Sequence, residues 1–151
     1  MTNKFNQIES LVAAFVSNDS DLSAEFNLVH EKLKEETREY HTHQLPACGV
    51  WASGYQPGDQ LGGLLAQVQV LVEVIHRGGD LATVDNKVKE LASLLTDKLR
   101  AESPNNRGLG FSGQAADISV ERIEFIDYGK DANAQFTISA FLYLTIGVLE
   151  K

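Results

Sequence analysis

Residues 118–148, ISVERIEFIDYGKDANAQFTISAFLYLTIGV, decide the fold. Apolar and polar side chains alternate over Ile118–Ile126 and, for longer, over Ala134–Val148, which is the period of a β-strand. Tyr128-Gly129-Lys130-Asp131 lies between the two runs and supplies residues that favour a tight turn. We therefore expect the chain to end in an antiparallel β-hairpin.

The final strand has one apolar and one mixed face, and the same holds for a strand expected over Leu64–His76. The apolar faces carry Phe136, Ile138, Ala140, Leu142, Leu144, Ile146 and Val148 in the one strand, and Ala66, Val68, Val70, Val72 and Val74 in the other. The mixed faces carry Thr137, Ser139, Phe141, Tyr143 and Thr145, and Gln67, Gln69, Leu71, Glu73 and Ile75. The apolar faces belong on a core.

Two helices and one further strand precede the Leu64–His76 strand. Apolar residues recur at helical spacing over residues 4–17, and Leu22, Phe26, Val29 and Leu33 continue that spacing in a second helix. Part of this second helix is open to an alternative, because tertiary contacts can draw it into an edge strand. Pro46 opens a strand over Ala47–Ala52, and a turn-rich loop over Gly54–Gly63 follows.

The clearest helix pattern runs from Asp80 to Ala101. Asp80 is a plausible N-cap after Gly78-Gly79, and Lys98 and Arg100 in the last turn complement the helix dipole. The chain thus predicts an α+β fold in one domain over residues 1–151. We expect about four strands in a largely antiparallel or mixed sheet, with a C-terminal β-hairpin and two or three packed helices.

Composition narrows the functional classes. The 151 residues include 13 basic and 21 acidic side chains, a formal charge of −8, which disfavours broad binding to nucleic-acid phosphates. Cys48 is the single cysteine, so an internal disulfide is excluded and a reducing compartment is expected. No signal peptide is expected, and no apolar run approaches the ~20 residues of a membrane helix.

Three sequence patterns are candidates for a chemical site. Gly108–Gly113 matches G-x-G-x-x-G, but a helix precedes it and a strand follows, the reverse of a dinucleotide site. His41, His43 and Cys48 match no standard zinc spacing, and Ser112 lacks a nucleophile elbow. We therefore expect no enzyme activity, no cofactor and no metal.

Interaction surfaces are the remaining candidates. Leu71, Ile75, Phe141 and Tyr143 are unusually apolar for solvent-facing positions, so either a helix or another subunit covers that face. The glycine-rich loop after the 80–101 helix would order on contact with a partner. The candidate interface residues are Gln67, Gln69, Glu73, Phe141, Tyr143, Asn105, Asn106, Arg107, Gly108, Gly110 and Ser112.

The order of these elements carries a resemblance. A Pro-led strand over 45–51, a Val-rich strand over 64–76, a helix opened by Gly-Gly-Asp and the closing hairpin follow an N-terminal helix. Over roughly residues 45–150 the chain resembles the tail terminator, or minor tail protein, family of long-tailed bacteriophages and prophages. Residues 18–44 depart from that pattern as a helical insertion. The family offers no universal site residues to carry over.

The resemblance implies a mechanical role. Such proteins cap the tail tube as a hexameric ring, end its polymerisation and provide the surface for head joining. The implied partners are further copies of the chain, the tail-tube protein and a head–tail connector, with assembly in the host bacterial cytoplasm and a final place in the virion tail. Another head–tail connector or tail-completion protein is the nearest alternative. A small ligand- or metal-binding regulatory domain is the alternative of a different class.

Overall fold

The computed structural model describes residues 4–31, 40–57 and 65–149. Its helices are α1 (Lys4–Asn18), α2 (Ser20–Ser23), α3 (Leu81–Glu102) and α4 (Gly110–Gly113), with 3₁₀ turns at Thr42–Gln44 and Pro104–Asn106. Its strands are β1 (Leu28–Glu31), β2 (Ala47–Gln56), β3 (Leu65–Gly78), β4 (Asp117–Lys130) and β5 (Phe136–Leu149).

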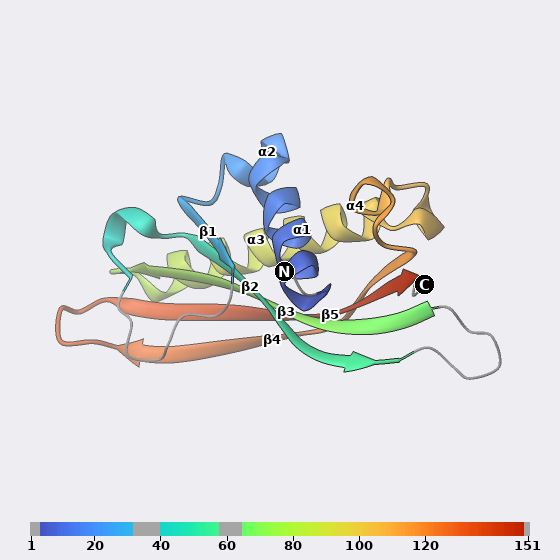
Figure 1. Cartoon of the computed structure of the whole chain (residues 1–151). Coiled ribbons are helices and arrows are strands. Elements are labelled where there is room, and N and C mark those ends of the chain that lie inside the picture. The colour runs from blue at the N-terminus through green and yellow to red at the C-terminus, as the bar shows by residue number, and fades with distance from the viewer. Residues whose placement is uncertain (1–3, 32–39, 58–64, 150–151) are drawn as a thin grey trace.

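The strands form one sheet in the order β1-β2-β3-β5-β4. β1 pairs with β2 in parallel, and every other pair is antiparallel. The helices lie together on one side of the sheet (Figure 1). The expected α+β fold with a mixed sheet and a C-terminal hairpin is confirmed, with five strands where about four were expected.

The core lies between the helices and the apolar face of the sheet. All five small apolar side chains predicted for that face of β3 are buried, as are Ile138 to Ile146 at alternate positions of β5. α3 supplies a complementary stripe: Val84, Val88, Leu91, Leu95 and Leu99. The stripe faces the core because these residues repeat every three or four positions, which puts them on one side of a helix. Asp80 caps this helix by accepting a hydrogen bond from the backbone N–H of Thr83, as expected.

The predicted second helix ends after its first turn, and the alternative of an edge strand is confirmed for part of the segment. α2 ends at Ser23, and Leu28–Glu31 forms the edge strand β1 instead. The reason is a pair of hydrogen bonds from Asn27 to the residues just before β2. The Asn27 backbone N–H donates to the Pro46 carbonyl (2.9 Å), and the Asn27 side-chain amide donates to the Leu45 carbonyl (2.7 Å). These bonds hold the following residues beside β2. The remainder of the expected helix, through Leu33, lies outside the described residues.

The hairpin turn lies later than the sequence pattern predicted. Tyr128, Gly129 and Lys130 belong to β4, and the register shifts between Asp127 and Lys130, where Gly129 adopts a φ of 81°. The chain reverses over residues 131–135. There the Asp131 carboxylate accepts hydrogen bonds from the N–H groups of Asn133 (2.8 Å) and Gln135 (3.0 Å). Gly129 therefore marks a β-bulge, a role glycine also takes in strands.

The α3 stripe yields a stability prediction. Leu95 is fully buried, so Leu95→Ala should lower the free energy of unfolding by about 2–5 kcal/mol through lost burial and a residual cavity. Leu81 is the matched control, because it lies on the same helix with 40% of its surface exposed, and Leu81→Ala should cost within about 0.5 kcal/mol. Urea unfolding followed by circular dichroism measures both. Equal losses would contradict the described packing.

Candidate functional site

The sheet has a second face, on the side away from the helices. One end of that face is covered by the chain itself, because Tyr40 and Leu45 pack over Ala47 and Ile75 in a small cluster separate from the main core. Arg77 stabilises this cluster, because its Nη1 donates a hydrogen bond to the Tyr40 carbonyl (2.9 Å). We call the remaining part, from Trp51 on β2 across to Arg122 on β4, the open face.

A row of four side chains crosses the open face. Leu71 pairs with Trp51 on one side and with Tyr143 on the other, and Tyr143 pairs with Arg122. Trp51 is 41% exposed, Leu71 and Tyr143 are half-buried, and Arg122 is exposed. These residues thus come from four adjacent strands and lie side by side on one surface. Trp, Tyr and Arg are the side chains most enriched at the energetic centres of protein interfaces.

Contacts with Glu124 and with each other fix the orientation of Arg122 and Tyr143 in this row. The Arg122 guanidinium lies 4.1 Å from the centre of the Tyr143 ring. The Tyr143 hydroxyl donates to Glu124 Oε2 (3.1 Å), and Arg122 Nη1 lies 3.3 Å from Glu124 Oε1. Each side chain is therefore held by the other two. Such pre-organisation lowers the entropy lost when a partner docks.

The structure brings five of the predicted interface residues onto this face. Gln67, Gln69 and Glu73 on β3 lie opposite Gly147, Thr145 and Phe141 on β5, and Tyr143 lies between them. No described helix covers these positions, so the first of the two expected covers is ruled out for the described residues. Their role in an interface stays a prediction. Arg122 and Glu124 were missed, because only the strand register shows that they join the row.

Glu73 is an exception on this face, since only 9% of its surface is exposed. Ser139 Oγ donates to its Oε2 (2.9 Å). Burial raises the pKa of this carboxyl above its usual 4.5, although the Ser139 hydrogen bond acts in the opposite direction. Gly49 on β2 pairs with Glu73, and the His30 ring occupies the space over Gly49. A Cβ added at Gly49 would lie 2.5 Å from His30 Cε1. Glu73 is therefore a structural group of the sheet more than an exposed contact.

The raised pKa of Glu73 predicts a pH dependence. The folded protein binds a proton at Glu73 more tightly than the unfolded chain, so stability from this group is present at acid pH and is lost as pH rises through the folded pKa. Glu73→Gln removes this titrating carboxyl. The free energy of unfolding of the variant, minus that of the wild type, should therefore increase from pH 4 to pH 8. Chemical denaturation at several pH values measures it. Glu124→Gln, with an exposed carboxylate on the same face, is the control; a pH-independent difference for Glu73→Gln would contradict the assignment.

The other predicted interface residues lie on the opposite side of the molecule. Asn105, Asn106, Arg107, Gly108, Gly110 and Ser112 follow α3 in the helical layer (Figure 1), so they do not join the open face. Their segment contains α4, in which Gly110, Phe111, Ser112 and Gly113 have φ values of 59°, 53°, 61° and 86°. α4 is therefore a left-handed turn. Left-handed geometry costs a non-glycine residue roughly 1–2 kcal/mol, and two residues here carry that cost.

Packing holds the left-handed turn in place. The Phe111 ring is buried and meets the Phe15 ring edge-on, with 5.5 Å between their centres. The Phe111 N–H donates to Glu102 Oε2 at the end of α3 (2.8 Å). Gly108 leaves no room for a side chain, since a Cβ there would lie 2.2 Å from the carbonyl oxygen of Ala101. The glycine-rich loop is therefore tightly packed and conformationally demanding within the protein itself.

A groove lies between this turn and α1. Its volume is about 330 Å³, and it is lined by Leu11, Ala14, Phe15, Asn18, Asp19, Glu102, Leu109, Phe111 and Ser112. Leu109 stands at its rim with 75% of its surface exposed. The walls are thus mainly apolar, with two carboxylates among them.

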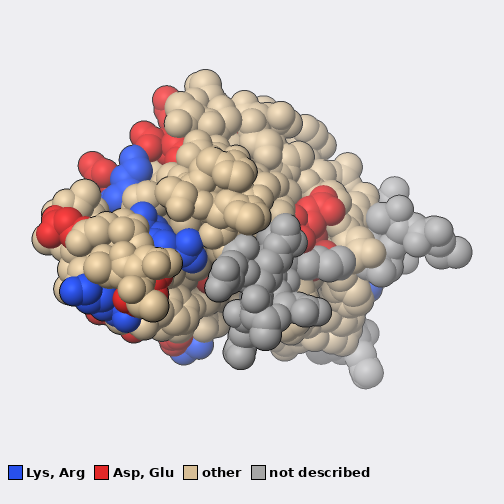
Figure 2. Space-filling model, turned by 90° about the vertical axis from the view of Figure 1, so that its left-hand side faces the viewer, with Lys and Arg blue, Asp and Glu red and all other residues tan. Residues whose placement is uncertain are grey.

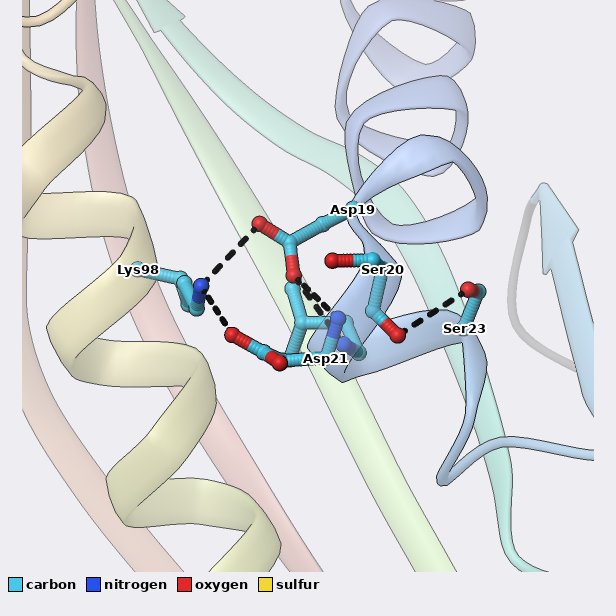
Figure 3. Close-up of polar contacts among 6 residues, drawn as sticks. Asp19, Ser20, Asp21, Ser23 and Lys98 are labelled. Carbon is cyan, nitrogen blue, oxygen red and sulfur yellow. Dashed lines mark hydrogen bonds and ion pairs between the residues drawn. The ribbon is translucent and has the colours of Figure 1, made fainter.

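The Asp19 carboxylate at the groove is held by several donors (Figure 3). Its Oδ1 accepts from the N–H groups of Asp21 and Leu22 (both 3.0 Å), and its Oδ2 lies 3.4 Å from Lys98 Nζ. Lys98 also contacts Asp21 Oδ2 at 2.6 Å. Burial raises the pKa of Asp19, but the backbone donors and Lys98 outweigh burial and lower it, so Asp19 carries a charge at neutral pH.

The left-handed turn predicts unequal costs at two glycines. A Cβ at Gly110 would lie 2.3 Å from the Ala115 carbonyl oxygen, whereas one at Gly113 meets nothing within 4 Å. Gly113→Ala should therefore cost only the conformational strain of about 1–2 kcal/mol. Gly110→Ala should cost clearly more, because the same strain is joined by a backbone collision. Thermal unfolding compares the two variants, and equal costs would argue against the turn.

The other chemical patterns do not assemble into a site. Cys48 is buried in the main core, and burial followed by the charge of Glu73 raises its pKa to about 12. His41 and His43 stack on each other in exposed positions, with 5.5 Å between ring centres. Among the described residues no group of three His, Cys, Asp or Glu side chains is placed to hold a metal ion, and no helix is long and apolar enough to cross a membrane.

Charges of both signs alternate at the end of the molecule where the β4–β5 turn lies. Figure 2 shows Lys and Arg interspersed with Asp and Glu on the visible part of this end. Lys89 pairs with Asp85 (2.8 Å) and Lys87 with Glu25. The part that Figure 2 shows therefore lacks the single-sign basic field that attracts nucleic-acid phosphates.

Comparison with known proteins shows similarity at the level of fold. No protein-family model matches the chain, and no curated protein does. Among solved structures, a chain from the virion of a native gene transfer agent (GTA) particle superposes with a TM-score of 0.55. The two chains are 17% identical, and the alignment covers 94% of each. At this identity the similarity shows a shared fold along nearly the whole chain.

Proposed function

We propose that this protein is a structural component of a phage-like virion that caps the tail tube as a ring. In this role it ends tube polymerisation and provides the surface to which the head joins. It assembles in the host bacterial cytoplasm, and its final place is the virion tail. Its function is assembly without catalysis, metal or cofactor.

The open face carries this proposal. Trp51, Tyr143 and Arg122 lie in one row on a surface that no described helix covers, and Glu124 holds two of them in place. Large aromatic and guanidinium side chains in such an arrangement are the groups that contribute most when they are buried against a protein partner. The chemistry of the surface therefore supports a protein partner.

Fold similarity supports the setting. The chain of similar fold belongs to the virion of a gene transfer agent particle. The order of helices and strands also resembles the tail terminator family of long-tailed phages. Because this similarity lies in fold alone, it fits a neighbouring position equally well. Another head–tail connector or tail-completion protein is therefore the second candidate function.

The two edges of the sheet support a ring. One edge is the four-residue strand β1, and the other is the fourteen-residue strand β4. Unlike surfaces on opposite sides of a subunit suit heterologous contacts, which close into a ring when the rotation between copies allows it. We infer a hexamer from the family resemblance, with the tail-tube protein on one side of the ring and a head–tail connector on the other.

Electron microscopy of tube ends tests the proposal. The cognate tail-tube protein is polymerised alone and with this protein, and negatively stained tubes are measured. Ring-shaped caps and tubes of limited length are expected. Unlimited tubes with bare ends would overturn the terminator role, and binding to isolated head connectors in that case would favour the second candidate.

Matched arginine variants connect the result to the open face. Arg122→Ala should abolish capping, because it removes the cation from the Tyr143 ring and frees Glu124. Arg100→Ala is the control, since Arg100 is exposed in the last turn of α3 in the helical layer. Both variants should unfold within about 0.5 kcal/mol of the wild type. Full capping by Arg122→Ala would exclude the open face as the contact surface.

A further inference from the structure

The groove between α1 and α4 is a second surface with a chemistry of its own. It lies in the helical layer, so it is separated from the open face by the sheet. Its apolar wall is continuous from Leu11 and Phe15 on α1 to Phe111 in the left-handed turn, since the two phenyl rings touch. A ligand that enters it must present an apolar group.

The charges at the groove are unbalanced. Of the residues that line it, Asp19 and Glu102 are carboxylates and none is a cation. Lys98 approaches Asp19 from outside the lining, but it is shared with Asp21 (Figure 3). Lys98 is therefore divided between two carboxylates, and the lining itself contains two carboxylates and no cation. A cationic group entering the groove gains a favourable interaction that an anion or a neutral group lacks.

Leu109 shows the same preference for an apolar partner. It is the most exposed of the large apolar side chains among the described residues, and it stands directly before the left-handed turn. The turn holds Phe111 inside the groove wall and Leu109 at the rim, at the expense of strain in Phe111 and Ser112. Strain of this kind persists where the surrounding structure maintains a particular surface.

We propose that the groove binds a segment of a partner protein in which a Lys or Arg side chain stands next to a large apolar side chain. The apolar group packs between Phe15, Phe111 and Leu109, and the cation lies toward Asp19 and Glu102. This inference does not depend on the proposed function, because it concerns a different surface and a partner defined only by its chemistry.

Peptide titration tests the inference without tail tubes. The probe is the blocked peptide Ac-Phe-Lys-Leu-Arg-amide, added to ¹⁵N-labelled protein and followed by amide chemical shifts. Shift changes should be confined to residues 11–19 and 102–113. The acidic peptide Ac-Phe-Glu-Leu-Glu-amide and the peptide without apolar groups, Ac-Gly-Lys-Gly-Arg-amide, should each bind at least about tenfold more weakly.

Two lysine variants on α1 provide the matched control. Ala14 lines the groove and Ser17 does not, and both are exposed on the same helix. Ala14→Lys fills the groove and adds a cation, so it should weaken binding of the basic peptide by about tenfold or more. Ser17→Lys makes the same change of charge and should leave the affinity within about twofold.

Three outcomes would overturn the proposal. The first is the absence of shifts at the groove at millimolar peptide, and the second is equal affinity of the two lysine variants. The third is self-association: if ultracentrifugation shows that Ala14→Lys alone dissociates an oligomer, the occupant is a second copy of the chain. Each of these results leaves the tube-capping experiment unaffected, so the two proposals fail separately.

Discussion

The pairing of β3 with β5 is the constraint on which the rest of the structure depends. Fourteen consecutive positions pair without a break, from Leu65 with Leu149 to Gly78 with Phe136. Because side chains alternate along both strands, this one register places Val68, Val70, Val72 and Val74 on the same side as Leu142 and Leu144, and the mixed positions on the other. A shift by one residue would exchange the two faces, so burial against α3 fixes the register.

One-sided burial also explains why the molecule has two separate surfaces. α1 and α3 cover the apolar side of the sheet, and the charged and aromatic side is left for contacts outside the fold. On the helical side, α1 and the end of α3 do not meet closely enough to fill the space between them. The left-handed turn enters that space with Phe111 and leaves the groove beside it. Both surfaces therefore result from the packing of the helices on one face of the sheet.

Strong periodicity made the long elements predictable. The hairpin strands, β3 and the Asp80-capped α3 follow from alternation and capping, because burial of one face selects these patterns. The apolar spacing over Leu22–Leu33 is helical, but only its first turn forms a helix. Leu22 and Phe26 reach the core from that turn and from the loop after it. The same spacing then continues into a strand that the hydrogen bonds of Asn27 hold beside β2. The predicted hairpin turn lies too early in the chain, because a glycine in the sequence is equally typical of a β-bulge and of a tight turn.

The candidate surfaces were predictable only in part. Phe141 and Tyr143 were identifiable as too apolar for solvent, yet Trp51 and Arg122 join them through a register that the sequence does not display. The groove depends on Phe15, Glu102 and Phe111, which are far apart in sequence and meet only in the fold. No local pattern in the chain indicates such a meeting.

The irregular edge of the sheet has a consequence for the behaviour of the protein at high concentration. Among the described strands β4 forms one edge of the sheet, interrupted by register shifts at Val120/Arg122 and at Asp127/Lys130, and charged side chains lie along it. Bulges and charges of this kind blunt edge-to-edge strand addition, the route by which β-proteins form aggregates. The geometry and charge of β4 therefore disfavour edge-to-edge pairing between copies of the chain.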